Sequence, residues 1–218
     1  MKKLLAAMFV ALLMVGCGES DLSDPDVVED ATADAVDWSK LQDRYGVTYL
    51  PNTDKPFSGY AKQVYENEQV EALAQFKDGY VVRLKQWQEN GTPRWDAGLI
   101  EGKVGVVGMP LEDWRDSNSS HHDGPTTIWY ENGQKMSEVN FKDGELDGLA
   151  TGWYESGQKE QEVNWKDEKV MSAEVWKPDG EKCLETNVKD GNGVWVWYNE
   201  DGTESGRSPF KDGELVRD

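Results

Sequence analysis

The stretch that decides the fold reads Trp-Tyr-Glu-Asn-Gly at residues 129–133, Phe-Lys-Asp-Gly at 141–144, Trp-Tyr-Glu-Ser-Gly at 153–157 and Trp-Lys-Asp-Glu at 165–168. Related turn sequences end at residues 68, 91, 133, 157, 180 and 202. A second turn sequence ends 11 residues after each of them. The closing positions are 22–24 residues apart, except for one interval of 42. A fixed offset repeated six times indicates a repeat array with one insertion.

Each repeat has the pattern of a β-hairpin. Asn-Gly, Ser-Gly and Asp-Gly supply the positive φ angles of a tight two-residue hairpin turn. Ser137, Val139 and Phe141 alternate with polar residues, which is the period of two typical of a strand with one apolar face. The same register places Leu184 and Val188 on the inner face of the fifth returning strand. Because an isolated hairpin is not stable in water, neighbouring hairpins must share an apolar face.

The sequence therefore predicts an all-β fold. We expect an elongated stack of about six antiparallel β-hairpin repeats that forms a single extended, twisted sheet over residues 38–218, with the insertion at residues 103–123. Insertions in repeat arrays commonly map to a binding face, and a decayed repeat without a role is an equal alternative.

The repeating pattern resembles the MORN repeat variant of bacterial proteins. The resemblance rests on the Tyr-Glu-Asn-Gly turn, on the Phe-Lys-Asp-Gly return and on the lead-in sequences at residues 46–51 and 55–60. Proteins built of this repeat are often labelled antitoxins of the YwqK type. The resemblance implies a hairpin-repeat fold and a role in scaffolding or protein interaction.

The first residues predict a lipoprotein signal peptide over residues 1–16. Lys2 and Lys3 form a positive start, and the apolar run from Leu4 to Val15 is shorter than the roughly 20 residues that span a bilayer. Small residues lead into Cys17, as in the lipobox of bacterial lipoproteins, a resemblance that implies cleavage before Cys17 and a diacylglycerol, usually with a further acyl chain such as palmitate. We expect a lipid-anchored protein of the cell envelope, in the outer membrane if the cell is Gram-negative.

Residues 17–37 are expected to form an acidic, disordered tether. Residues 18–37 carry eight acids, no basic residue and no aromatic residue, a composition that cannot bury enough apolar area to offset the cost of ordering. A short helix over residues 27–36 is the alternative.

The aromatic residues are the first candidates for a binding site. The chain has 10 Trp and 8 Tyr, and adjacent aromatic residues in a strand lie on opposite faces of the sheet. An exposed aromatic ladder could bind a protein or stack on a glycan, whereas aromatic residues that only pack neighbouring hairpins together are the alternative. The candidate binding residues are Trp129, Tyr130, Trp153, Tyr154, Trp176, Trp197 and Tyr198.

Other chemistry has little support in the sequence. His121 and His122 are the only histidines and are expected in a solvent-exposed loop, without the further Cys or His ligands that a metal site needs. A lysine precedes most of the Asp-containing turns, which argues against calcium. We therefore expect no catalytic residues, no metal and no cofactor, and a chain that is not an enzyme.

The charge of the chain excludes one class of partner. The formal net charge is −19, and removal of residues 1–16 with Lys2 and Lys3 would make it −21. Such a surface repels nucleic acids and anionic lipid head groups. The sequence thus predicts a non-enzymatic, membrane-anchored repeat protein that binds an unknown protein partner, with glycan or cell-wall binding through Trp and Tyr as the alternative.

Overall fold

The computed structural model describes residue 22, residues 25–102 and residues 121–217. The predicted signal peptide, Cys17 and most of the insertion lie outside these residues. The main sheet contains β1 (Val36–Asp37), β4 (Gly59–Val64), β5 (Val70–Lys77), β6 (Tyr80–Trp87), β7 (Pro93–Leu99), β8 (His122–Trp129), β9 (Lys135–Lys142), β10 (Glu145–Leu146), β11 (Gly148–Trp153), β12 (Lys159–Lys166) and β13 (Lys169–Val175). The other elements are α1 (Pro25–Asp34), the 3-10 helix η1 (Trp38–Lys40), β2 (Gln42–Arg44), β3 (Val47–Tyr49), β14 (Gly193–Tyr198), β15 (Glu204–Lys211) and β16 (Glu214–Leu215).

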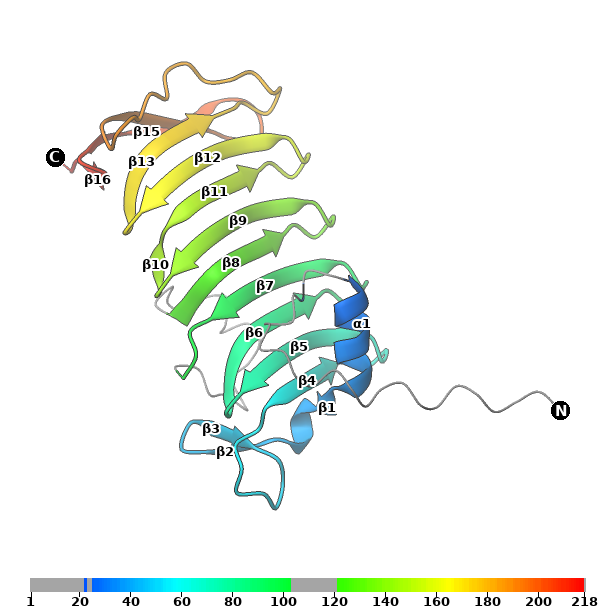
Figure 1. The fold of residues 1–218 in the computed structure, drawn as a ribbon. Coiled ribbons are helices and arrows are strands. Elements are labelled where there is room, and N and C mark those ends of the chain that lie inside the picture. Colours follow the sequence, from blue (N-terminus) through cyan, green and yellow to red (C-terminus); the bar gives the residue numbers. More distant parts are fainter. Residues whose placement is uncertain (1–21, 23–24, 103–120, 218) are drawn as a thin grey trace.

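The main sheet confirms the predicted stack of β-hairpins. Its strand order is β1-β4-β5-β6-β7-β8-β9-β11-β12-β13, with β10 paired to β9, so the hairpins follow one another along a curved, twisted ribbon (Figure 1). Every pair is antiparallel except β1 and β4. Within the described residues, each hairpin therefore lies beside its sequence neighbour.

The two kinds of turn differ in their backbone geometry. At the Phe-Lys-Asp-Gly turn, both Asp143 (φ 52°) and Gly144 (φ 90°) adopt positive φ, as the predicted two-residue hairpin turn requires. At the Tyr-Glu-Asn-Gly turn, only Gly133 has a positive φ, of 84°. Its N–H donates to Tyr130 O at 3.0 Å, and Tyr130 N–H donates to Gln134 O at 2.9 Å. This is the longer hairpin loop that ends in a left-handed residue, so the two-residue prediction was wrong at this turn.

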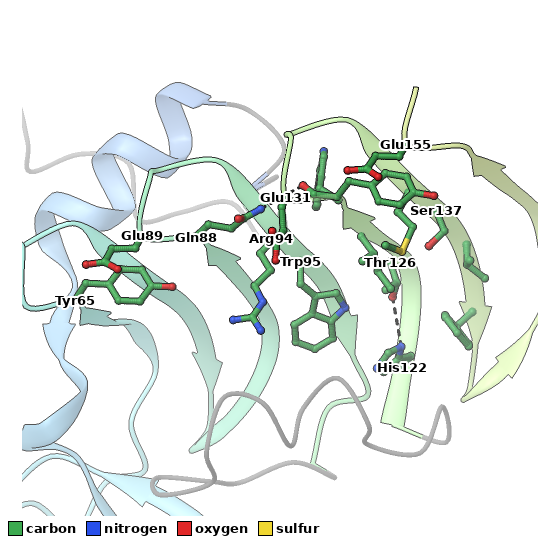
Figure 2. A pocket seen from close by; sticks show the side chains of 16 residues that line it. Tyr65, Gln88, Glu89, Arg94, Trp95, His122, Thr126, Glu131, Ser137 and Glu155 are labelled. Atoms are coloured by element: carbon green, nitrogen blue, oxygen red, sulfur yellow. Dashed lines mark hydrogen bonds between the residues drawn. The ribbon is translucent and has the colours of Figure 1, made fainter. Parts of the chain in front are cut away.

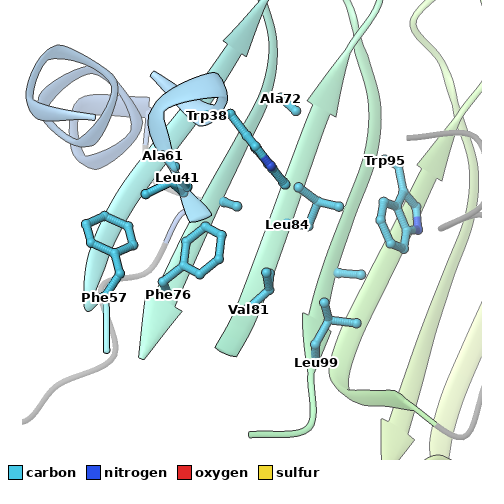
Figure 3. Close-up of a cluster of buried hydrophobic side chains, with 12 residues drawn as sticks. Trp38, Leu41, Phe57, Ala61, Ala72, Phe76, Val81, Leu84, Trp95 and Leu99 are labelled. Atoms are coloured by element: carbon cyan, nitrogen blue, oxygen red, sulfur yellow. The ribbon is translucent and has the colours of Figure 1, made fainter. Parts of the chain in front are cut away.

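The sheet has two different faces. Residues paired across strands share a face, so the register places Ala61, Ala74, Leu84, Ala97, Thr126 and Val139 in one row on what we call the core face. The opposite face, which we call the helix face, carries Lys62, Leu73, Lys85, Asp96, Thr127 and Glu138 in the parallel row. On the core face of the first hairpins, Trp38, Leu41 and Phe57 cover the sheet (Figure 3).

Helix α1 corrects the prediction of a disordered tether. Its residues lie inside the stretch 17–37 that composition assigned to disorder, yet the helix packs on the helix face against β4, β5 and β6 (Figure 1). Leu22 and Ala31 are buried against Leu73. Lys62 Nζ donates to Thr32 O at 2.8 Å, and Lys85 Nζ donates to Leu22 O at 2.9 Å. The helix forms because its few apolar side chains share one side while its acids face water.

The fifth repeat departs from the prediction. No strand forms at residues 184–188, where Leu184 is 87% exposed while Cys183 is buried. Thr186 Oγ1 bonds to the N–H and to the O of Val196, so a side chain replaces part of the strand ladder. The last hairpin, β14–β15 with β16, consequently forms a separate three-stranded sheet. It packs on the core face of β12 and β13 rather than extending the main sheet (Figure 1).

Gly98 lies against the main chain of the next strand, and this close contact generates a prediction about stability. A Cβ atom on Gly98 of β7 would lie 2.1 Å from the main-chain oxygen of Asp123 in β8. Gly98→Ala must therefore push the strands apart, and we expect it to lower the free energy of unfolding by about 2–3 kcal/mol in thermal melts followed by circular dichroism. Gly152→Ala is the matched control, because its Cβ would contact only the flexible side chain of Gln161. Equal losses in the two variants would contradict this account.

Candidate functional site

The predicted tyrosines join neighbouring hairpins. The hydroxyl of Tyr130 donates to Trp153 O, and that of Tyr154 donates to Trp176 O, each at 2.8 Å. Tyr65 makes the same bond to Trp87 O at 2.8 Å. Burial, and then the nearby glutamate charges, raises the pKa of both Tyr130 and Tyr154, so both hydroxyls remain protonated donors at neutral pH. These tyrosines therefore stabilise the stack rather than forming an exposed ladder.

The predicted tryptophans are covered by lysine side chains. Trp153 and Trp176 are half-buried. Lys135 Nζ lies 5.6 Å from the ring centre of Trp153, and Lys159 Nζ lies 5.1 Å from that of Trp176, which is the range of a cation–π contact. Because ammonium groups already occupy these rings, the rings are not free platforms for a sugar. Trp129 is also half-buried.

The last two candidates belong to the C-terminal hairpin. Trp197 packs edge-on against Trp195, with ring centres 6.1 Å apart, and lies over Gly206, whose added Cβ would be 3.0 Å from the Trp197 ring. The hydroxyl of Tyr198 contacts Cys183 Sγ at 3.3 Å. All seven candidate aromatics are thus buried or half-buried, and the structure gives each residue whose contacts are described a packing role.

A hollow that sequence reasoning missed lies on the core face over β7, β8 and β9. It has a volume of about 760 Å³, and its apolar lining includes Ile128, Val139 and Phe141 together with Trp95, which Figure 2 shows beside His122. The predicted strand pattern had assigned Val139 and Phe141 to the inner face, but a pattern cannot show whether another element covers them. Both are only half-buried, so this part of the apolar face remains open in the described structure.

The edge of the hollow that lies beside the hairpin turns is acidic. Glu89, Glu131 and Glu155 lie on three turns along this edge and are exposed (Figure 2). Glu200 of the last hairpin reaches the same area, where its Oε1 accepts from Glu155 N–H at 3.0 Å. Burial raises the pKa of the half-buried Glu160, and the charge of Glu200 raises it further. Carboxylates therefore crowd this side of the molecule.

His122 is the residue whose position differs most from the prediction. Instead of lying in a solvent-exposed loop, it begins β8 and is buried, with its ring centre 4.9 Å from that of Phe141. Burial, and then the charge of His121, lowers its pKa, so the imidazole is neutral at pH 7. Its Nδ1 lies 3.4 Å from Thr126 Oγ1. In the part of the chain that the structure describes, no three His, Cys, Asp or Glu side chains form a group that could hold a metal.

Comparison with known proteins agrees with the fold. The MORN repeat variant matches residues 123–143 and 146–167, which include most of hairpin β8–β9 and of hairpin β11–β12. No curated protein matches the chain. The match supports a repeat scaffold of the kind that commonly serves protein or membrane interaction. None of the helices among the described residues is both long enough and apolar enough to cross a bilayer.

The hydroxyl of Tyr154 provides a test of the stacking bonds. Tyr154→Phe leaves the main-chain oxygen of Trp176 without this donor, and we expect a loss of about 1–2 kcal/mol in the free energy of unfolding, measured by urea denaturation. Tyr45→Phe is the control, because Tyr45 is fully exposed. A Tyr154→Phe variant as stable as the control would show that the bond does not stabilise the stack.

The raised pKa of Glu160 predicts a pH-dependent effect. Because the folded state holds the Glu160 proton more tightly than the unfolded state, its stabilising contribution is present at low pH and is lost as the pH rises through the raised pKa. Glu160→Gln should therefore raise the melting temperature at pH 7, and the difference from the unmodified chain should shrink towards pH 4. Glu145→Gln, at an exposed position, controls for the general loss of one negative charge. The same gain in both variants at every pH would contradict the role of burial.

Proposed function

We propose that the chain is a non-enzymatic, membrane-anchored scaffold that binds a protein partner outside the cytoplasm. The observation that supports this proposal is the open apolar hollow in the middle of a sheet whose other core-face residues are largely covered. Large exposed apolar areas with a polar rim are typical of interaction sites on stable proteins. The sheet supplies a rigid platform, because each hairpin is bonded on both sides.

Anchoring is the second part of the proposal. It rests on the positive start at Lys2 and Lys3, the short apolar run and Cys17, which together fit a lipoprotein signal followed by acylation. We propose on this basis that the folded part lies at the surface of a cell-envelope membrane. The antitoxin label that often accompanies this repeat would apply only to a toxin that also acts in the envelope.

Glycan binding has less support as a function. Stacking on a sugar needs an open aromatic face, and the rings of Trp153 and Trp176 are covered by Lys135 and Lys159. Those lysines are held by ion pairs with Glu138 and Glu162. At these two positions, cation–π contacts and ion pairs therefore already occupy the helix face.

Substitution of Met136 tests the proposed function. Met136 lines the hollow and is 37% exposed, so a lysine there changes the hollow without emptying the core. We expect Met136→Lys to abolish crosslinking of one specific protein to the tagged lipoprotein in its native cells, read out by mass spectrometry. Leu149→Lys is the matched control, because Leu149 is 48% exposed and pairs with Asn164 of β12 on the helix face.

A partner lost from Leu149→Lys but kept by Met136→Lys would move the interaction to the helix face. Binding of the unmodified chain to a polysaccharide array, with no crosslinked protein, would replace the scaffold proposal by glycan binding.

A further inference from the structure

The hollow lies between two groups of side chains that cover the core face. At the N-terminal end, Trp38, Leu41 and Phe57 pack over the first hairpins. At the C-terminal end, Trp195 and Phe210 pack over Val163 and Val170. Between these covers, no described element lies over the core face of β8 and β9. Among the described residues, the area between these covers is therefore bounded at both ends.

The floor and the edge of the hollow have different chemistry. Ile128, Val139 and Phe141 make an apolar floor, against which a partner side chain could lose its contact with water. Glu89, Glu131 and Glu155 add three carboxylates along the edge formed by the turns. Among the described residues of the lining, Arg94 is the one Lys or Arg against these carboxylates, so the edge favours a positively charged neighbour. The volume of about 760 Å³ is in the range of ligand sites, roughly 300–1,000 Å³.

One polar atom in the hollow has no partner. His122 Nε2 is buried and makes no hydrogen bond to any residue that the structure describes. Unsatisfied buried polar atoms are costly, and a bound molecule that supplies a donor or an acceptor would remove this cost. His122 lines the hollow beside Trp95, with ring centres 5.9 Å apart. Because this nitrogen is itself buried, a bound molecule reaches it only if the His122 side chain shifts.

We propose that the hollow binds an extended peptide segment of a partner protein in which an apolar side chain is flanked by lysine or arginine. The apolar side chain lies on Ile128, Val139 and Phe141, and the basic side chains reach the carboxylates of the edge. The inference rests on the proposed function, since it names the chemistry of the partner at the same site. It follows from charge complementarity, because the net charge of −19 also repels acidic segments.

Synthetic peptides and the full chain provide the test. The probe is a fluorescent eight-residue peptide of alternating lysine and leucine, and its affinity is measured by fluorescence anisotropy. We expect binding that weakens at least tenfold when the NaCl concentration rises from 0.05 M to 0.5 M, because salt screens charges across the edge. Peptides with glutamate in place of lysine, or with serine in place of leucine, should bind at least tenfold more weakly than the probe.

Charge-reversal variants test whether the probe binds in the hollow. The double variant Glu131→Lys/Glu155→Lys changes two exposed side chains at the edge of the hollow and should lower the affinity for the probe at least tenfold. Glu145→Lys/Glu168→Lys changes two exposed acids at the opposite ends of the hairpins and should leave the affinity within about twofold. Val139→Thr keeps the side-chain shape, adds a hydroxyl to the floor and should also weaken the probe. Circular dichroism melts verify that all variants are folded.

Four results would overturn the inference, the last of them only in part. Equal weakening by both double variants would mean that the probe responds only to total charge. Equal affinity for the serine peptide would mean that the apolar floor is not used. Probe binding that appears only after residues 103–120 are replaced by a short Gly-Ser linker would mean that the chain itself occupies the hollow. A specific partner lost with Met136→Lys but unaffected by Glu131→Lys/Glu155→Lys would leave the scaffold function standing and overturn only the basic character of its partner.

Discussion

The structure depends on hydrogen bonds between one hairpin and the next. A two-stranded hairpin alone is marginal in water, so each repeat needs both its neighbours. Main-chain bonds such as those between β9 and β11 supply one part of this link. The other part is made at the turns, where Tyr130 and Asn132 reach main-chain oxygens of the next hairpin. The spacing of 22–24 residues is therefore a structural requirement, because it places each side-chain donor beside its main-chain acceptor in the next hairpin.

The two edge strands of the main sheet must also be protected, because an open strand edge can pair with another chain. At the first edge, β4 is covered by the short parallel strand β1 and by contacts with α1. At the other end, the chain leaves the main sheet after β13 and folds its last hairpin back over the core face. In that hairpin, Pro209 interrupts the row of N–H donors on β15. These ends restrict growth of the sheet, and among the described residues they leave the hollow between them as an accessible apolar area.

The repeat and its strands could be predicted from the sequence because turn residues and alternation are local signals. Asp143 and Gly144 required positive φ whatever surrounded them. The docked helix could be predicted only as an alternative. The acids between Pro25 and Asp34 favoured disorder, and the contacts that hold the helix, with Leu73 and Lys62, come from residues far along the chain. The candidate site was hidden for a similar reason. Phe141 follows the same alternation as a fully covered residue, and only the arrangement of the covers leaves it partly open.

The docked α1 also changes how the protein is held at a membrane. If Cys17 carries the lipid, the first residue docked on the sheet is the buried Leu22, five residues later, and not one at the end of a twenty-residue tether. Five extended residues span at most about 17 Å. The sheet is then kept within a few nanometres of the bilayer with a restricted orientation, and its helix face is tied to the anchor. The hollow lies on the opposite face, so a membrane-bound partner would meet it sideways, within the same thin layer above the lipid.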